Sequence, residues 1–332
     1  MKKLIQGFTT QLKEALKIGR AVTLLDKDTD IRNVLITGMG GSGIGANLIN
    51  SFAFNQIMVP ITVFKGYDIP SFVNNHTLFI ACSYSGNTEE TVATLRKAMH
   101  KQAQIICITS GGEMLQLAKE NNHSCIQLPA GYDSPRAMIG FMMVALLFSL
   151  HAVNLIESAF IKQIEDAIKY LDSQADSIQV EAEGIAKKLV GKLPIIYCDV
   201  HLIGVATRFQ QQLNENAKQI AHVNTFPEMN HNEIEGWKFP ENIIKLIQVI
   251  YLRSSNEHKR VKKRLEICRE IFEKSSCSVI DISPHGVSIL EQYLYLIHLT
   301  DWISYFVAKK NNVDPTEIEI INYLKSELDK IV

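Results

Sequence analysis

The chain has 332 residues, of which 46% are hydrophobic and 21% are charged, a composition typical of a globular protein. Its 34 basic and 35 acidic residues leave a formal net charge of −1, so no overall positive field attracts nucleic acid. These values exclude a dedicated nucleic-acid binder, and the length suits two domains of ordinary size.

Six cysteines occur without any C-x-x-C pair, at positions 82, 107, 125, 198, 268 and 277. The first four lie in apolar, strand-like runs, where cysteine behaves as a small hydrophobic residue. We therefore expect neither a disulfide framework nor a zinc site, and we expect the protein to be cytoplasmic.

The first half of the chain alternates between helical patterns and short apolar runs. An amphipathic helix is predicted in the first 20 residues, a helix is predicted from about Ile44, and another extends through 96–100. Strands are predicted at 33–37, 61–64, 77–82, 104–109 and 124–128. Apolar strands that alternate with helices indicate a parallel sheet covered on both faces.

The segment 137–156 has no charged residue and is long enough to span a membrane. It contains Ser149, His151 and Asn154, and it lacks basic or aromatic anchors at both ends. A helix buried on all sides in a large α/β core has the same composition. We therefore predict a core helix over 137–151 and no membrane association.

The alternation of strands and helices restarts after a polar helical region at about 155–190. Strands are predicted at 194–198, 243–252 and 278–282, and helices at 204–220, 257–272, 286–311 and 315–329, the last with Pro315 in its first position. The predicted fold is α/β, with two doubly wound domains at 1–153 and 154–332 whose parallel sheets are flanked by helices.

The loop at residues 38–45 (GMGGSGIG) joins a predicted strand to a helix and contains five glycines. Its backbone N–H groups can converge on an anion together with the positive end of the helix. The G-x-G-x-x-G spacing also fits a dinucleotide fold, which needs an acidic residue where this sequence has Lys65. No Gly-Lys-Ser/Thr follows, so the loop does not fit a Walker motif.

A second loop at residues 83–91 (SYSGNTEET) follows the third predicted strand directly. The hydroxyls of Ser83, Ser85 and Thr88, with the free N–H groups of a helix start, can bind a phosphate monoester without metal. The alternative is an ordinary helix cap rich in hydroxyl groups. Two such loops at the carboxyl ends of strands in one sheet favour a phosphate site.

Three further motifs follow in the chain: PRA at 135–137, NENAK at 214–218 and PEMNHNEIEGW at 227–237. Together with the two loops they resemble the bifunctional phosphoglucose/phosphomannose isomerase family, which has two sugar isomerase (SIS) domains. The resemblance covers Gly38 to Trp237 in family order. It implies a homodimer that isomerises hexose 6-phosphates between aldose and ketose through a cis-enediolate, without metal or cofactor.

The resemblance also implies roles for single residues. Glu215 would transfer the proton between C1 and C2, Arg136 would stabilise the enediolate, and His231 would open the sugar ring. The phosphate would be bound by Gly41, Ser42, Ser83, Ser85 and Thr88.

Two roles stay open between several candidates. Lys309, Lys310 and Lys325 compete for the lysine that the wider superfamily places near the ring oxygen. Thr300 and Ser304 are candidates for the residue that lets the intermediate rotate about C2–C3.

The three catalytic candidates are of the types that this chemistry requires. A carboxylate suits proton transfer between adjacent carbons, a fixed cation stabilises the enediolate oxygen, and histidine titrates near neutrality. Each also has an ordinary alternative: a solvated helix residue for Glu215, a capping or pairing role for Arg136, and a locally bonded loop residue for His231.

A metal site is a further alternative, because acidic residues and histidines cluster at His222, Glu228, His231, Glu233 and Glu235. No H-x-x-x-H spacing supports it.

Two other functions fit the same fold. An aminosugar phosphate isomerase or deaminase would need a different set of bases, and a sugar-phosphate sensor would have no reason to keep Glu215, Arg136 and His231 together. A sensor commonly carries a helix-turn-helix, for which the first 32 residues are too short. The sequence does not distinguish glucose 6-phosphate from mannose 6-phosphate as substrate.

Overall fold

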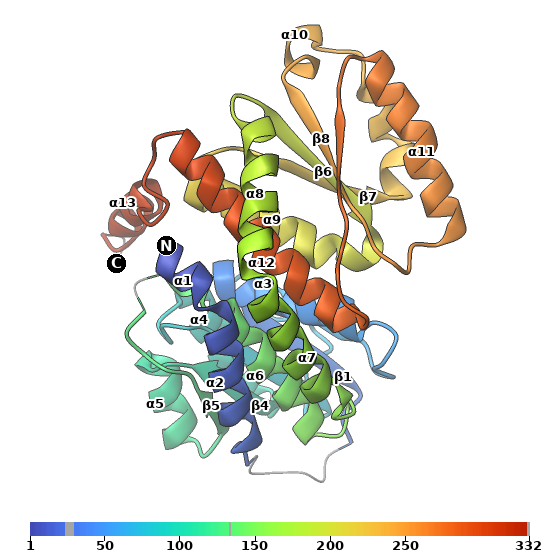
Figure 1. The fold of residues 1–332 in the computed structure, drawn as a ribbon. Helices are drawn as coiled ribbons and strands as arrows, with labels where there is room; N and C mark the ends of the chain where they lie inside the picture. Colours follow the sequence, from blue (N-terminus) through green and yellow to red (C-terminus); the bar gives the residue numbers. More distant parts are fainter. Residues whose placement is uncertain (24–29, 133, 331–332) are drawn as a thin grey trace.

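The computed structural model describes residues 1–23, 30–132 and 134–330, and it confirms an α/β fold with two parallel sheets (Figure 1). The sheets lie in separate halves of the molecule, with long helices between and beside them. None of the helices in the described ranges is long and apolar enough to cross a membrane.

The first sheet has five parallel strands in the order β2-β1-β3-β4-β5. Their bounds are β1 (Asn33–Gly38), β2 (Ile61–Phe64), β3 (Thr77–Cys82), β4 (Gln104–Thr109) and β5 (Ser124–Gln127). Nearly every residue of β1, β3 and β4 is buried, because helices cover both faces of a parallel sheet. The strand order reverses between β1 and β3, and such reversal points are where α/β sheets bind ligands.

Helices cover the two faces of the first sheet in two sets. One face packs against α2 (Phe8–Arg20), α3 (Gly40–Ala53) and α6 (Ile139–Ala152); the other packs against α4 (Glu89–His100) and α5 (Gly112–Glu120). Residues 139–150 of α6 are all buried, and Ser149 donates its hydroxyl hydrogen to the Ala145 carbonyl. The predicted core helix is confirmed, and α1 (Lys2–Gln6) precedes α2 at the N-terminus.

The second sheet has four parallel strands in the order β7-β6-β8-β9, which repeats the reversal of the first sheet. Their bounds are β6 (Leu193–Asp199), β7 (His222–Phe226), β8 (Ile247–Leu252) and β9 (Val279–Ile282). One face packs against α9 (Ile203–Ala217) through Ile196 and Cys198, and the opposite face carries Tyr197 within an aromatic cluster. The helix α11 (Lys259–Lys274) contributes Phe272 to that cluster.

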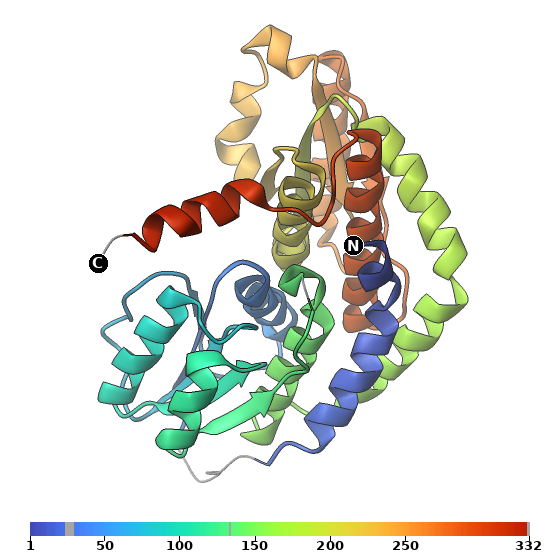
Figure 2. The ribbon, with the colours of Figure 1, turned by 90° about the vertical axis from the view of Figure 1, so that its left-hand side faces the viewer.

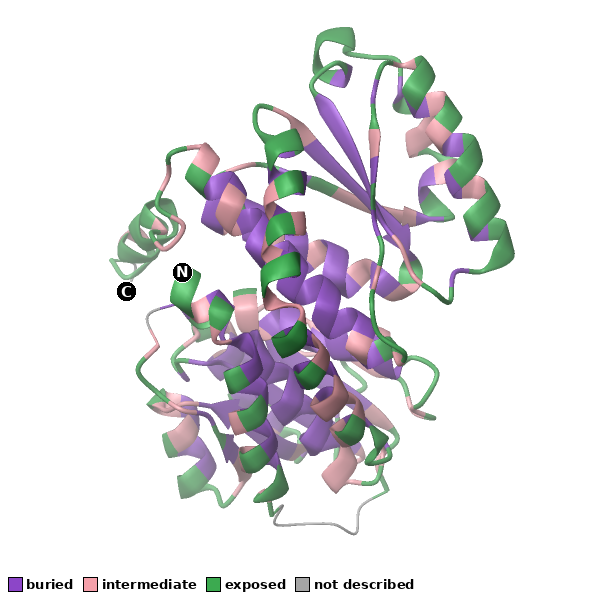
Figure 3. Cartoon of the chain, viewed as in Figure 1, coloured by how far each residue is buried: buried purple, intermediate pink, exposed green. Residues whose placement is uncertain are grey.

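A long central helix, α12 (Ile289–Lys310), contacts α7 (Ala159–Ser173), α8 (Ala175–Leu189) and α9. Figure 3 shows α12 as largely buried, whereas the C-terminal helix α13 (Glu319–Leu328) is exposed along most of its length. In Figure 2, α13 extends from the second half of the molecule across the first, above the carboxyl edge of the first sheet.

Several predicted boundaries are wrong. The strand predicted at 243–252 begins at Ile247, because a short helix, α10 (Glu241–Ile244), follows Pro240. The helix predicted at 315–329 begins at Glu319, because the preceding carbonyl groups bind two cationic side chains described below. The sequence analysis also missed β7, a half-exposed edge strand, and α5.

Candidate active site

The two glycine- and hydroxyl-bearing loops meet at the carboxyl edge of the first sheet. Gly38 at the end of β1 lies in register with Cys82 at the end of β3. The helix α3 begins at Gly40, just after β1, and α4 begins at Glu89, after the loop 83–88, so both N-termini lie at this edge. Their unpaired N–H groups and partial positive charges favour an anion there.

The hydroxyl groups of the second loop form one cluster. Ser83 Oγ lies 2.7 Å from Thr88 Oγ1 and 3.5 Å from Ser85 Oγ. The first loop joins this cluster, because Ser42 Oγ accepts a hydrogen bond of 3.1 Å from the Tyr84 amide. The structure therefore brings together the four hydroxyl residues that the sequence analysis singled out. Lys65 also lies beside the first loop, where a dinucleotide fold would need a carboxylate.

Gly41 connects the first loop to Arg136. A Cβ atom built on Gly41 would lie 2.9 Å from Arg136 Cα, so the two backbones are in direct contact. Arg136 lies in a short 3-10 helix at Pro135–Ala137, and only 6% of its surface is exposed. The glycine-rich loop and the arginine are thus fixed relative to each other by backbone packing.

We predict that Gly41→Ala lowers kcat/KM for a sugar phosphate about tenfold or more, because the methyl group displaces Arg136 from the loop. Steady-state kinetics check this expectation. Gly184→Ala on α8 is the control, since nothing lies within 4 Å of its Cβ position. Equal kinetics for the two variants would contradict the prediction.

The Arg136 guanidinium is held on two of its three nitrogen atoms. Nε donates to Asn216 Oδ1 at 2.9 Å, and Nη2 donates to the carbonyls of Pro315 and Thr316 at 2.7 and 3.1 Å. Burial lowers the pKa of Arg136, although arginine stays charged at neutral pH. Within the described residues, Nη1 makes no hydrogen bond, so it is left to bind an incoming oxygen.

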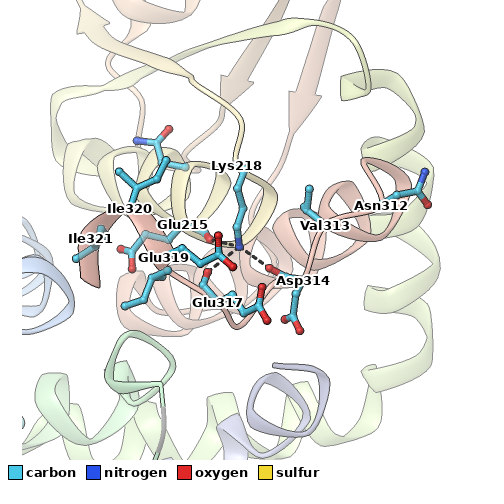
Figure 4. Close-up of a pocket in the computed structure, with 11 residues that line it drawn as sticks. Glu215, Lys218, Asn312, Val313, Asp314, Glu317, Glu319, Ile320 and Ile321 are labelled. Atoms are coloured by element: carbon cyan, nitrogen blue, oxygen red, sulfur yellow. Dashed lines mark hydrogen bonds between the residues drawn. The ribbon is translucent and has the colours of Figure 1, made fainter. Parts of the chain in front are cut away.

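Glu215 lies next to this guanidinium, near the C-terminal end of α9. Its Oε2 is 3.7 Å from Arg136 Nε, and about a quarter of its side chain is exposed. Glu215 lines a cavity of about 490 Å³ between α9 and the segment that leads from α12 into α13 (Figure 4). Lys218 also lines the cavity, and its Nζ donates to the carbonyls of Glu215, Asp314 and Glu317.

His231 is not among the residues that line this cavity. It ends a 3-10 helix at Glu228–His231, is exposed, and makes no hydrogen bond or ion pair with any described residue. The loop after it packs on the face of the second sheet that carries Tyr197, because Glu233 accepts the Tyr197 hydroxyl hydrogen at 2.5 Å. The helix that carries Glu215 covers the opposite face. Within one chain, therefore, the second sheet lies between these two residues.

Glu233 fixes the loop that carries His231. Besides Tyr197, it accepts hydrogen bonds from Asn224 Nδ2 at 2.5 Å and from His222 Nε2 at 3.1 Å. These donors, with the charge of His222, lower the pKa of Glu233 to about 2 against the cost of burial. The Glu233 carboxylate in turn raises the pKa of His222.

The contact between Glu233 and His222 is expected to make the stability of this loop depend on pH. The stabilisation that comes from the lowered pKa of Glu233 is present above about pH 4.5 and is lost as pH falls towards 2. The stabilisation that comes from the raised pKa of His222 is present below about pH 6.5 and is lost as pH rises further. We expect His222→Gln to lower Tm most between pH 4.5 and 6.5. The effect is about 0.5 kcal/mol because half of His222 is exposed. A Tm difference that does not change with pH would contradict this.

The remaining sequence candidates have other partners. The hydroxyls of Thr300 and Ser304 are buried within α12 and donate to carbonyls of their own helix, so neither lines the cavity. Lys310 Nζ lies 3.5 Å from Glu183 on α8, and Lys309 is exposed. Lys325 lies on α13, whose first residues line the cavity.

The sequence analysis missed a buried ion pair behind Arg136. Arg208 on α9 donates to Asp301 on α12 at 2.6 Å, and both side chains are almost fully buried. The spacing of these two residues along the chain gives no signal of their contact. Among the described residues, no group of three histidine, cysteine or acidic side chains is arranged to hold a metal ion.

Comparison with family models identifies both halves of the chain. Residues 29–155 match the SIS domain, and residues 178–328 match the bacterial phospho-glucose isomerase C-terminal SIS domain. The chain is similar to the bifunctional phosphoglucose/phosphomannose isomerase of Caldicellulosiruptor bescii, with 36% identity over 98% of both chains. The protein of the same name from Aquifex aeolicus is 34% identical over 99% of this chain and 98% of its own length.

Two further similar proteins carry other names. The D-glucosamine-6-phosphate 4-epimerase of Sulfolobus acidocaldarius is 32% identical over 60% of this chain and 61% of its own. The structure of the C-terminal domain of glucosamine-fructose-6-phosphate aminotransferase from Francisella tularensis superposes with a TM-score of 0.77 and 15% identity, covering 96% of this chain and 98% of that one. The latter similarity supports the double SIS fold.

Proposed function

Because this chain belongs to the bifunctional phosphoglucose/phosphomannose isomerase family, we propose that it interconverts hexose 6-phosphates between aldose and ketose. The substrates are glucose 6-phosphate, mannose 6-phosphate or both, and the common product is fructose 6-phosphate. The observation that carries this proposal is the position of Arg136, which contacts the phosphate loop at Gly41 and lies 3.7 Å from Glu215.

The phosphate group binds at the carboxyl edge of the first sheet. The hydroxyls of Ser85 and Thr88 each lie within 3.5 Å of the Ser83 hydroxyl, and Ser42 accepts a hydrogen bond from the same loop. Neutral hydroxyl and amide donors, with two helix N-termini, can satisfy the phosphate oxygens. This anchor leaves the sugar carbons to extend past Gly41 and Arg136 towards Glu215.

Glu215 then acts as the base of the isomerisation. Starting from an open-chain aldose, its carboxylate removes the proton from C2, and the aldehyde oxygen at C1 takes up the negative charge of a cis-enediolate. The same carboxyl group returns the proton to C1, while the proton of the C2 hydroxyl moves to the C1 oxygen, so that C2 becomes the ketone and C1 carries a hydroxyl group. Arg136 stabilises the enediolate through its free Nη1 group.

His231 opens the ring, and we propose that it comes from a second subunit. The second sheet lies between His231 and Glu215 of the same chain, and the His231 side chain is exposed and unpaired among the described residues. A homodimer can place an exposed loop of one subunit at the cavity of the other. Of the three candidates for the lysine near the ring oxygen, we favour Lys325, because it lies on α13, whose first residues line the cavity.

Other expectations accompany this proposal. We place the boundary between the two SIS domains at residues 153 and 154, between α6 and α7. Six free cysteines support a cytoplasmic location.

A coupled assay tests the function. The purified protein is expected to convert both aldose phosphates and fructose 6-phosphate into one another, with activity unchanged by EDTA, because hydroxyl, amide and guanidinium groups supply the necessary donors. Glucosamine 6-phosphate is the comparison substrate for the aminosugar alternative. Turnover of glucosamine 6-phosphate, without turnover of glucose, mannose or fructose 6-phosphate, would refute the proposed function.

A further inference from the structure

Asn216 is buried at the centre of a closed polar network between the two halves of the molecule. Its Oδ1 accepts from Arg136 Nε at 2.9 Å, and its Nδ2 donates to Ser304 Oγ at 2.9 Å. None of its surface is exposed. Both ends of the amide are therefore engaged, and its orientation is fixed by one acceptor and one donor contact.

Groups on α9 and α12 hold this asparagine in place. Ser304 donates onward to the carbonyl of Asp301 at 2.7 Å, and the Asp301 carboxylate accepts from Arg208 and Gln212 at 2.6 and 3.0 Å. Arg208 Nη1 closes the loop by donating to the Arg136 carbonyl at 3.2 Å. Of the buried polar atoms of Arg208, Nε has no partner among the described residues. The network is nevertheless rigid, because a side chain in it moves only by breaking several bonds.

Arg136 has an alternative partner close by. Glu215 Oε2 lies 3.7 Å from Arg136 Nε, too far for a hydrogen bond but close enough for a small rotation to form one. A charge-assisted bond between the two groups would be strong. It would occupy the carboxylate that acts as base and would turn Nη1 away from its present direction.

We propose that Asn216 is a positioning residue that holds Arg136 apart from Glu215. By accepting the Nε hydrogen, it removes the donor that points towards the carboxylate, and the Pro315 and Thr316 carbonyls hold Nη2. Nη1 is then the one part of the guanidinium free to bind the enediolate oxygen. This inference rests on the proposed function, since it takes Arg136 and Glu215 as the reacting pair.

The side chain required at this position is narrowly defined. A residue without an acceptor leaves Nε buried and free to turn to Glu215. An aspartate keeps both the volume and the acceptor, and the Ser304 hydroxyl can rotate to donate to it. Asn216→Asp is therefore expected to fold and to keep kcat within about fivefold of the wild type, whereas Asn216→Ala lowers kcat about 10- to 100-fold with KM within about threefold.

A double-mutant cycle with Arg136→Ala separates positioning from general destabilisation. If Asn216 acts only through Arg136, then Asn216→Ala has no further effect on kcat in the Arg136→Ala background. Asn311→Ala is the matched control, because the Asn311 amide, directly after α12, donates to Ala217 at the end of α9 and to Gln219 without touching Arg136. It is expected to lower Tm and to leave kcat unchanged.

The outcomes distinguish this inference from the function on which it rests. Additive losses in the cycle, wild-type kcat for Asn216→Ala, or a loss in Asn216→Asp as large as that of Arg136→Ala would overturn the positioning role alone. Wild-type kcat for Arg136→Ala would instead overturn the assignment of Arg136 in the proposed reaction.

Discussion

Glu215→Gln is expected to lower kcat by about 10³-fold or more, because an amide cannot accept the C2 proton. The substitution is nearly isosteric and leaves the hydroxyl groups of the two loops unchanged, so KM is expected to change little. Exchange of solvent deuterium into C2 of the aldose, followed by NMR, is expected to stop as well. That exchange requires proton abstraction but not completed isomerisation.

The matched control for this variant is Glu317→Gln. Glu317 lines the same cavity but lies on the segment before α13, and its backbone carbonyl, not its carboxylate, binds Lys218. We expect its kcat to stay near that of the wild type. Deuterium exchange that persists in Glu215→Gln would show that another group is the base.

Mixing two inactive variants is expected to restore activity if His231 acts from the partner subunit. In a heterodimer of Glu215→Gln and His231→Ala, one site carries both changes and the other carries none. Random exchange makes half of the dimers mixed, each with one intact site of two, so about a quarter of wild-type activity is expected. Subunits are exchanged under mild denaturation, and activity is then measured on the cyclic sugar phosphate.

Controls for this experiment use each variant alone after the same treatment. His231→Ala by itself is expected to keep activity on an open-chain substrate analogue, because ring opening precedes proton transfer. Absence of any recovery in the mixture, with heterodimers demonstrated by mass, would place His231 and Glu215 in the same subunit or exclude His231 from the reaction.

The sequence by itself determined the fold class and the place where the two glycine- and hydroxyl-bearing loops meet. Apolar runs such as 77–82 alternate with helical patterns, which is enough to predict buried parallel strands. The strings 38–45 and 83–91 follow such strands directly, and parallel strands carry their carboxyl ends to one edge of the sheet. Their meeting point therefore follows from local patterns alone, and the structure confirms it through the contact of Ser42 with the Tyr84 amide.

Other features depend on which faces of the elements meet. Thr300 and Ser304 were candidates for the residue that lets the intermediate rotate about C2–C3, yet the hydroxyls of both donate to carbonyls of α12 itself. The edge strand β7 was missed because its half-exposed residues, HVNTF, lack the apolar run of a buried strand. Helix α13 begins late because Arg136 and Lys218 bind the carbonyl groups before it, a contact across about 180 and 100 residues respectively.

The relation between the three catalytic candidates is likewise a tertiary property. Arg136 and Glu215 are 79 positions apart in sequence but 3.7 Å apart in space, whereas His231, only 16 positions from Glu215, lies beyond the second sheet. The sequence supplies the reactive groups, because their chemistry depends on residue type. Which of them share one site depends on the faces of β6 and α9 on which they lie, and long-range packing alone decides that.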